Sequence, residues 1–245
     1  MATQDIAPFD PRVPLLLLLS VTTGLVDAAS VLALGKVFTA NMTGNVVFLG
    51  FAAAGVPGFK VIPFVVAIAS FMVGALVSGR IGNSLVGGTE RRWLLTSAIF
   101  ETVALWLAAA AAVGFSVGDQ APESRLFAII ALTGIAMGFR NGTVRQLKVA
   151  DLTTTVLTLT LTGLSADSTA AGGSNPNWLR RTGAVASIFV GAAAGAYLLA
   201  QAGLVAPLAT AGALVLFGTF VCAMHPSSAR IVGPGHDNEP HRNTK

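Results

Sequence analysis

The chain has 245 residues, of which 53% are hydrophobic and only 11% are charged, and its mean hydropathy is +0.73. Soluble domains carry about 25% charged residues, so this composition excludes an ordinary soluble domain and indicates an integral membrane protein. The formal net charge of +4 comes mainly from loops and tails, where cations orient a membrane protein rather than bind nucleic acid. We therefore expect the lipid bilayer, and no nucleic acid, as the surroundings of the chain.

Hydropathy predicts an all-α, polytopic bundle, because a membrane span needs roughly 20 apolar residues. A polar N-terminal tail at 1–12 precedes a single transmembrane domain at 13–224, and a disordered tail is expected at 225–245. The apolar segments within the domain fall at 13–35, 40–56, 60–82, 92–115, 125–147, 150–166, 180–201 and 204–224.

The second and sixth segments are short and rich in polar residues, which is typical of broken or re-entrant helices. If all eight segments crossed, Lys and Arg would be divided almost evenly between the two sides. If these two segments enter and leave on one side, only Lys36, Lys60 and Arg125 lie opposite the other cations. The stronger bias favours about six crossings with both termini in the cytoplasm.

The two halves of the domain, about 13–115 and 125–224, resemble each other. Gly24–Ala28 aligns with Gly138–Gly142, and Ser70–Ala75 aligns with Ser187–Ala192, in the same order and at similar spacing. Three crossings in each half would invert the second half relative to the first. The sequence therefore predicts an inverted internal repeat, a plan that secondary transporters use.

Asp27 lies deep in the first segment, on the same helical face as Ser20, Thr23 and Ser30. A carboxylate at this depth costs a few kcal/mol or more unless it is neutralised, hydrated or paired, so it is a functional candidate. The alternative is a structural acid that accepts hydrogen bonds from a broken helix and never contacts substrate.

Two further charges lie inside apolar segments. Glu101 is central in the fourth segment, where it could carry a proton or bind a cation, and Arg140 is the most deeply placed basic residue. We predict an Asp27–Arg140 pair. The alternative is that Arg140 extends to the cytoplasmic interface with Arg145 and Lys148.

The second segment begins with Asn41-Met42-Thr43-Gly44-Asn45, in which amide and hydroxyl groups surround a glycine that permits an unwound turn. In the sixth segment, Thr155 and Thr158 form a weaker polar face, because threonine hydroxyls often bond to their own helix. The predicted substrate-binding residues are Asp27, Asn41, Thr43, Gly44, Asn45, Glu101, Arg140, Asn141, Thr155 and Thr158.

Signals for an enzyme are weak. The sequence has no phosphate-binding glycine loop, HExxH motif, nucleophile elbow or metal-spaced His/Cys cluster, and its three histidines lie at or beyond the last segment. The single cysteine, Cys222, cannot form an internal disulfide. We expect no catalytic activity, no cofactor and no bound metal.

Gly24–Ala28 followed by Phe38–Asn45 resembles the signature of the YoaK family of bacterial integral membrane proteins, and the resemblance covers most of the chain. It implies a multi-pass protein of the bacterial inner membrane, but no established activity. The chain departs from the family in having Arg140-Asn141 in place of Gln-Asn and Thr158-Leu159 in place of Thr-Gly. These departures argue against identical binding by both halves.

Two classes of function remain. The first is a transporter or permease for a small solute or ion, with a site near the membrane midplane at the broken helix. The second is a non-transporting membrane assembly or regulatory protein whose polar residues fasten the bundle. A channel and a membrane enzyme rank below these, and a homo-oligomer is compatible with all of them.

Overall fold

The structure, a computed structural model, describes residues 10–85, 87–147 and 157–229. Most of these residues are helical, none of them lies in a β-strand, and an isolated bridge joins Ser116 and Ala121. The prediction of an all-α fold is confirmed. In chain order the helices are α1 (Arg12–Ala33), α2 (Met42–Ala53), α3 (Val61–Ser84), α4 (Glu90–Ala111), α5 (Glu123–Leu147), α6 (Leu157–Ala166), the 3₁₀ turn η1 (Thr169–Ala171), α7 (Trp178–Ala202), α8 (Val205–Met224) and the 3₁₀ turn η2 (Pro226–Ala229).

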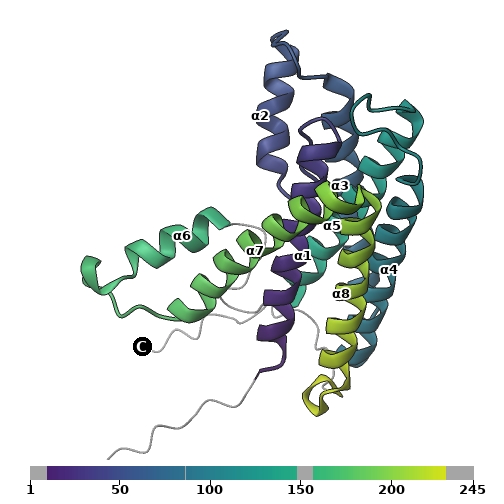
Figure 1. The fold of residues 1–245 in the computed structure, drawn as a ribbon. Helices are drawn as coiled ribbons and strands as arrows, with labels where there is room; N and C mark the ends of the chain where they lie inside the picture. Colours follow the sequence, from purple (N-terminus) through teal and green to yellow (C-terminus); the bar gives the residue numbers. More distant parts are fainter. Residues whose placement is uncertain (1–9, 86, 148–156, 230–245) are drawn as a thin grey trace, which may run out of the picture.

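Six of the helices, namely α1, α3, α4, α5, α7 and α8, are long and apolar enough to cross a membrane (Figure 1). They have 20 to 25 residues each, which at 1.5 Å per residue matches an apolar layer of about 30 Å. By contrast, α2 has 12 residues and α6 has 10. The prediction of six long apolar helices and two short ones is confirmed.

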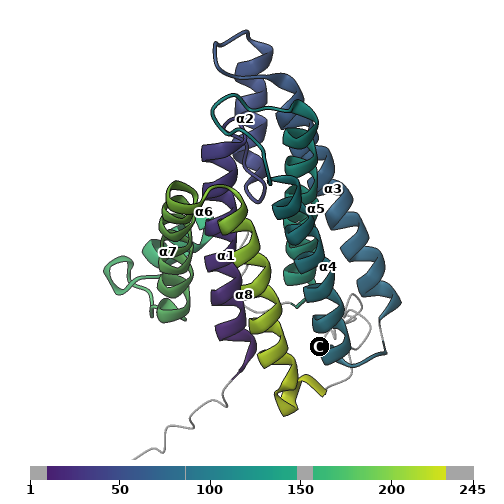
Figure 2. The same cartoon turned by 45° about the vertical axis from the view of Figure 1, so that its right-hand side comes forward.

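The first helix begins and the last long helix ends on the same side of the bundle. The start of α1 and the end of α8 are neighbours in two views (Figures 1 and 2), and the thiol of Cys222 lies 3.5 Å from the carbonyl oxygen of Pro11. The start of the disordered tail was predicted at residue 225, which is too early. Ser228 is buried in η2 and donates a hydrogen bond of 2.8 Å to the carbonyl of Cys222. Residues 1–9 and 230–245 lie outside the described part of the chain.

The helices pack as matched pairs around an apolar core, with α1 along α7, α3 along α5, and α4 against α8 (Figure 2). The α1–α7 contact depends on glycines. A Cβ atom added at Gly24 would overlap the carbonyl oxygen of Ile188, and one added at Gly191 would overlap that of Val21. The backbones therefore approach as closely as small-residue seams in membranes permit.

The α3–α5 contact is built in the same way. A Cβ atom added at Gly74 would overlap the carbonyl oxygen of Ile135, and one added at Gly138 would overlap that of Phe71. In the alignment of the two halves, Gly74 corresponds to Gly191 and Gly138 to Gly24. The same small residues therefore make the close contacts in both pairs.

Gly74→Val is expected to lower the thermal unfolding temperature of the purified protein in detergent, because the side chain would force α3 and α5 apart. Overpacking of this kind costs about 1–3 kcal/mol. Gly79→Val is the matched control in the same helix, since a Cβ atom there meets nothing within 4 Å. Equal losses in the two variants would contradict the close contact.

The segment before α2 turns back into the bundle, and α2 then lies beside the upper parts of α1 and α3 (Figure 1). The Nζ of Lys36 lies 4.5 Å from the centroid of the Phe59 ring, so the residues that precede and follow α2 meet at one end. This arrangement is the one expected of a re-entrant element rather than of a crossing.

Cysteines placed at Lys36 and Lys60, both exposed, are expected to react with an impermeant maleimide from the same side of the membrane. The measurement uses a Cys222→Ala background, and exposed Arg145 at the end of α5 provides a cysteine site for the other side. Labelling of positions 36 and 60 from opposite sides would show that α2 crosses.

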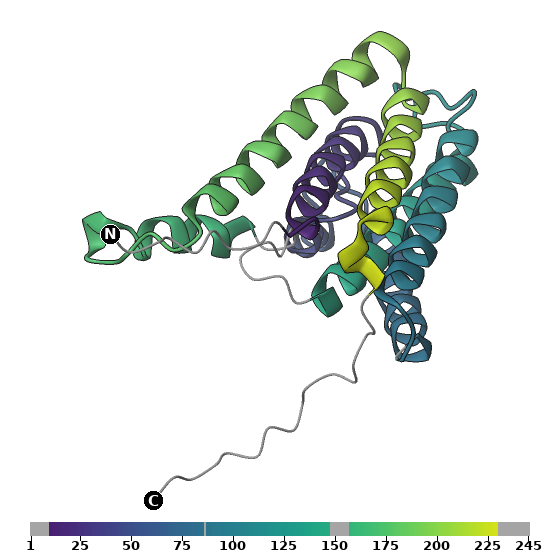
Figure 3. The same cartoon turned by 90° about the horizontal axis from the view of Figure 1, so that it is seen from below.

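The second short helix is held much less firmly than the first. Seen from below, α7 runs out from the bundle, and α6 lies beside its first half (Figure 3). No residue of α6 is buried, and an ion pair of 2.7 Å between Arg181 and Asp167 joins the end of α6 to α7. By contrast, α2 is fixed to α3 by a cluster of phenylalanine rings, Phe38, Phe48, Phe51, Phe59 and Phe64.

Candidate functional site

Asp27 fixes the loop that leads into α2. Its Oδ1 accepts hydrogen bonds from the backbone N–H groups of Thr39, at 3.0 Å, and Ala40, at 2.8 Å. These two donors precede the helix and have no place in its own hydrogen-bond ladder. The carboxylate therefore satisfies polar backbone groups that would be costly to leave unpaired in a membrane.

Asn45, in the first turn of α2, closes the same loop from the other side. Its Oδ1 accepts from the backbone N–H of Phe38 at 2.9 Å, and its Nδ2 donates to the carbonyl oxygen of Phe38 at 2.6 Å. The side chain is fully buried. Asn45 thus supports the loop through its buried side chain.

Gly44 is required by the same turn. A Cβ atom added there would lie 2.7 Å from the ring of Phe38, which stacks on Phe48 at a centroid distance of 6.2 Å. Any larger residue would push the ring away and disturb the segment that Asp27 and Asn45 hold.

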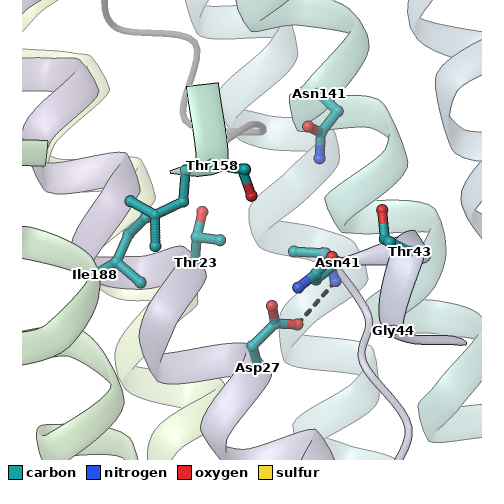
Figure 4. Close-up of a pocket in the computed structure, with 10 residues that line it drawn as sticks. Thr23, Asp27, Asn41, Thr43, Gly44, Asn141, Thr158 and Ile188 are labelled. Carbon is teal, nitrogen blue, oxygen red and sulfur yellow. Dashed lines mark hydrogen bonds between the residues drawn. The ribbon is translucent and has the colours of Figure 1, made fainter. Parts of the chain in front are cut away.

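Beside this loop is a cavity of about 260 Å³ between α1, α2, α5, α6 and α7. Asp27 and Thr23 lie on one side of it, and the side chains of Asn41, Thr43, Asn141 and Thr158 surround the same space (Figure 4). Its volume suits a small solute, and it combines a carboxylate, amides and hydroxyls with apolar surface, as ligand sites do. The lining residues are Thr23, Asp27, Ala40, Asn41, Thr43, Gly44, Asn141, Leu157, Thr158 and Ile188.

Arg140 and Glu101 form a buried ion pair next to this cavity. Arg140 is 2% exposed and Glu101 is 4% exposed. The Nε of Arg140 donates to Oε1 of Glu101 at 2.8 Å, and its Nη2 contacts the same oxygen. Its Nη1 donates to the Leu19 carbonyl at 3.0 Å and to the Thr23 hydroxyl at 2.9 Å. The guanidinium thus links α4 and α5 to α1.

This arrangement corrects the predicted partner of Arg140. The ion pair joins Arg140 to Glu101 and not to Asp27, and its burial also rules out the alternative in which Arg140 extends to the interface. Thr23 accepts a hydrogen bond from Arg140 and also lines the cavity, so it connects the ion pair to the Asp27 side of the site.

A second, much smaller cavity of about 20 Å³ borders the ion pair on its other side. The hydroxyl of Ser97 lies there buried and without a hydrogen-bond partner. A space of this size with a carboxylate and a hydroxyl in its wall has room for about one water molecule.

Comparison with known proteins places the chain in a family. The family described as "Protein of unknown function (DUF1275)" matches residues 15–221, which is nearly the whole helical bundle. The chain belongs to the DUF1275 family. It is also similar to the UPF0700 transmembrane protein YoaK of Bacillus subtilis (strain 168), with 34% identity over 159 residues that cover 64% of this chain and 67% of that protein. No solved structure matches significantly.

The expected resemblance to the YoaK family is therefore confirmed, and the family match spans all ten predicted site residues. The structure brings six of the ten to the larger cavity: Asp27, Asn41, Thr43, Gly44, Asn141 and Thr158. Glu101, Arg140 and Asn45 lie outside its lining, and Thr155 lies outside the described residues.

Three lining residues of this DUF1275 protein, Ala40, Leu157 and Ile188, were not predicted. They are apolar or small, and nothing in their type distinguishes them from packing residues. Thr23 was recognised only as part of the polar face of α1. Ile188 reaches the cavity through tertiary packing, because its backbone carbonyl lies against Gly24 in the close α1–α7 contact.

Proposed function

We propose that this DUF1275 protein is a transporter or permease for a small solute or ion. The observation that carries the proposal is the polar cavity of about 260 Å³, which lies at the break before α2 and is lined by residues of both halves of the chain. Transporters commonly bind their substrates where a broken helix meets the partner repeat.

The packing supports an inverted repeat as part of this proposal. In the alignment of the two halves, α1 to α4 correspond in order to α5 to α8. Replacing each helix by its counterpart converts the α1–α7 contact into the α3–α5 contact, and the α1–α8 contact into the α4–α5 contact. The alignment places Asp27 opposite Asn141, and both side chains reach the cavity. A site shared by two such halves is suited to opening alternately to the two sides.

We further propose that the protein lies in the bacterial inner membrane with both termini in the cytoplasm. Positive residues collect in the cytoplasmic loops of such proteins. The end of the bundle that holds the start of α1 and the end of α8 carries most of the cations in the described residues, namely Arg12, Arg80, Arg91, Arg92, Arg145, Arg180 and Arg181.

A non-transporting assembly or regulatory protein is the second candidate, and one observation favours it. Asp27 and Asn45 both form hydrogen bonds with the protein's own backbone, as a purely structural role requires. The absence of catalytic motifs from the sequence supports neither candidate over the other, but it leads us to propose that the protein is not an enzyme.

A binding screen separates the two candidates. The purified protein is heated with a panel of ions and small metabolites, and solutes that raise its unfolding temperature are tested for uptake into liposomes. We expect a saturable response that Asn41→Ala removes, because Asn41 lines the cavity. Asn83→Ala, at an exposed position in α3, is the matched control and should respond as the wild type does. If no solute stabilises the protein or enters the liposomes, the transporter proposal fails.

A further inference from the structure

The charges inside the bundle do not balance. Away from the helix ends, the described parts of the six long helices carry three charged residues: Asp27 in α1, Glu101 in α4 and Arg140 in α5. Glu101 and Arg140 neutralise each other in direct contact. Asp27 therefore remains as one negative charge without a charged partner, at the wall of the larger cavity.

Among the residues that the structure describes, no other group near Asp27 supplies a full positive charge that is free to pair with it. Helices α5, α7 and α8 pack against α1. On α5 the facing charge is Arg140, which Glu101 already holds. On α7 the charges are Arg180 and Arg181 in its first turn, about two helical turns before the cavity residue Ile188, and Arg181 pairs with Asp167.

The remaining titratable groups on α7 and α8 cannot carry a positive charge. The Tyr197 side chain of α7 is 67% exposed, and α8 contributes Cys222, beside Pro11 at the opposite end of α1 from Asp27. The loop offers Asp27 two backbone N–H dipoles, and the start of α2 adds a partial charge of about half a unit. Dipoles of this size stabilise a carboxylate without neutralising it.

We propose that the cavity binds a monovalent organic cation, of the ammonium class, in exchange for a proton on Asp27. The inference deepens the proposed transport function and rests on it. An uncompensated carboxylate within a membrane is strongly unfavourable. In every conformation of the transport cycle, Asp27 therefore needs either a bound proton or a bound cation to neutralise it. One carboxylate accepts either a proton or the cation, and this competition couples the two.

The exchange is balanced in charge and atoms. When the cation arrives, the O–H bond of the protonated carboxyl group breaks, the proton leaves to water, and the carboxylate pairs with the cation. The reverse step on the other side releases the cation. An organic cation is favoured over a bare metal ion because the cavity is large and part of its wall is apolar, from Ala40, Leu157 and Ile188.

Calorimetry and proton release test this inference on the full-length protein in detergent. The probes are methylammonium, ethanolammonium and choline chlorides, compared with sodium acetate and glycerol. We expect one or more of the ammonium ions to bind and to release up to one proton per cation into weakly buffered solution. Apparent affinity should fall towards low pH, approaching a tenfold loss per unit where the carboxyl group is protonated.

Asp27→Asn should abolish cation binding and proton release, while its amide oxygen still accepts from the loop. Glu90→Gln, at the first residue of α4, is the control and should bind as the wild type does. Saturable binding of acetate or glycerol, sensitive to Asn41→Ala, would overturn the cation inference and leave the transport proposal standing. Cation binding without proton release at any pH would overturn the exchange. No binding by any probe, together with a negative solute screen, would overturn both.

Discussion

Replacing Glu101 with Gln is expected to lower the free energy of unfolding by about 3–5 kcal/mol, because the change leaves the charge of Arg140 buried and without its partner. Arg140 is 2% exposed, and its remaining donors reach only the carbonyl of Leu19 and the hydroxyl of Thr23. Neither group is charged. The measurement is equilibrium unfolding in mixed detergent with wild-type protein alongside.

The double variant Glu101→Gln, Arg140→Met is the control for this prediction. Removing both charges eliminates the unpaired cation and preserves most of the side-chain volume, so it should recover a large part of the lost stability. If Arg140→Met alone and Glu101→Gln alone were harmless, the ion pair would have no structural role. Additive losses in the double variant would show that the two side chains do not interact.

Hydropathy was sufficient to predict the six long helices, because the bilayer requires a continuous apolar stretch for each one. It could not predict which buried charges meet. Glu101 and Arg140 are 39 residues apart in the chain and come together only because α4 packs against α5. The local pattern around Arg140 made Asp27 an equally reasonable partner, since the repeat alignment places the two in adjacent positions.

The two short helices also looked alike in the sequence, as polar, interrupted segments of similar length. Their tertiary environments differ, because α2 carries Phe48 and Phe51, which pack on Phe38, Phe59 and Phe64, whereas α6 buries no residue. Aromatic clusters of this kind depend on rings brought in from neighbouring segments. The polar residues indicated where the two short helices lie. The apolar residues determine that α2, and not α6, is packed firmly against the bundle.

The roles of Asp27 in the loop and in the cavity predict different results for two substitutions. Asp27→Ala is expected to lower the free energy of unfolding by about 2–5 kcal/mol, because the N–H groups of Thr39 and Ala40 both lose their acceptor. Asp27→Asn should cost about 1 kcal/mol or less, since an amide oxygen accepts the same two bonds. Unfolding in mixed detergent measures both values.

The function of the two variants should follow charge rather than stability. Asp27→Asn removes the negative charge from the cavity wall and keeps the loop, so it should lose solute binding although it remains folded. Thr22→Ala is the control for small changes in α1, because the Thr22 hydroxyl donates to the carbonyl of Leu19 within the same helix. If Asp27→Asn binds and transports as the wild type does, Asp27 is a structural acid and the assembly role gains support. If it is as unstable as Asp27→Ala, the amide does not replace the carboxylate and the loop depends on the negative charge itself.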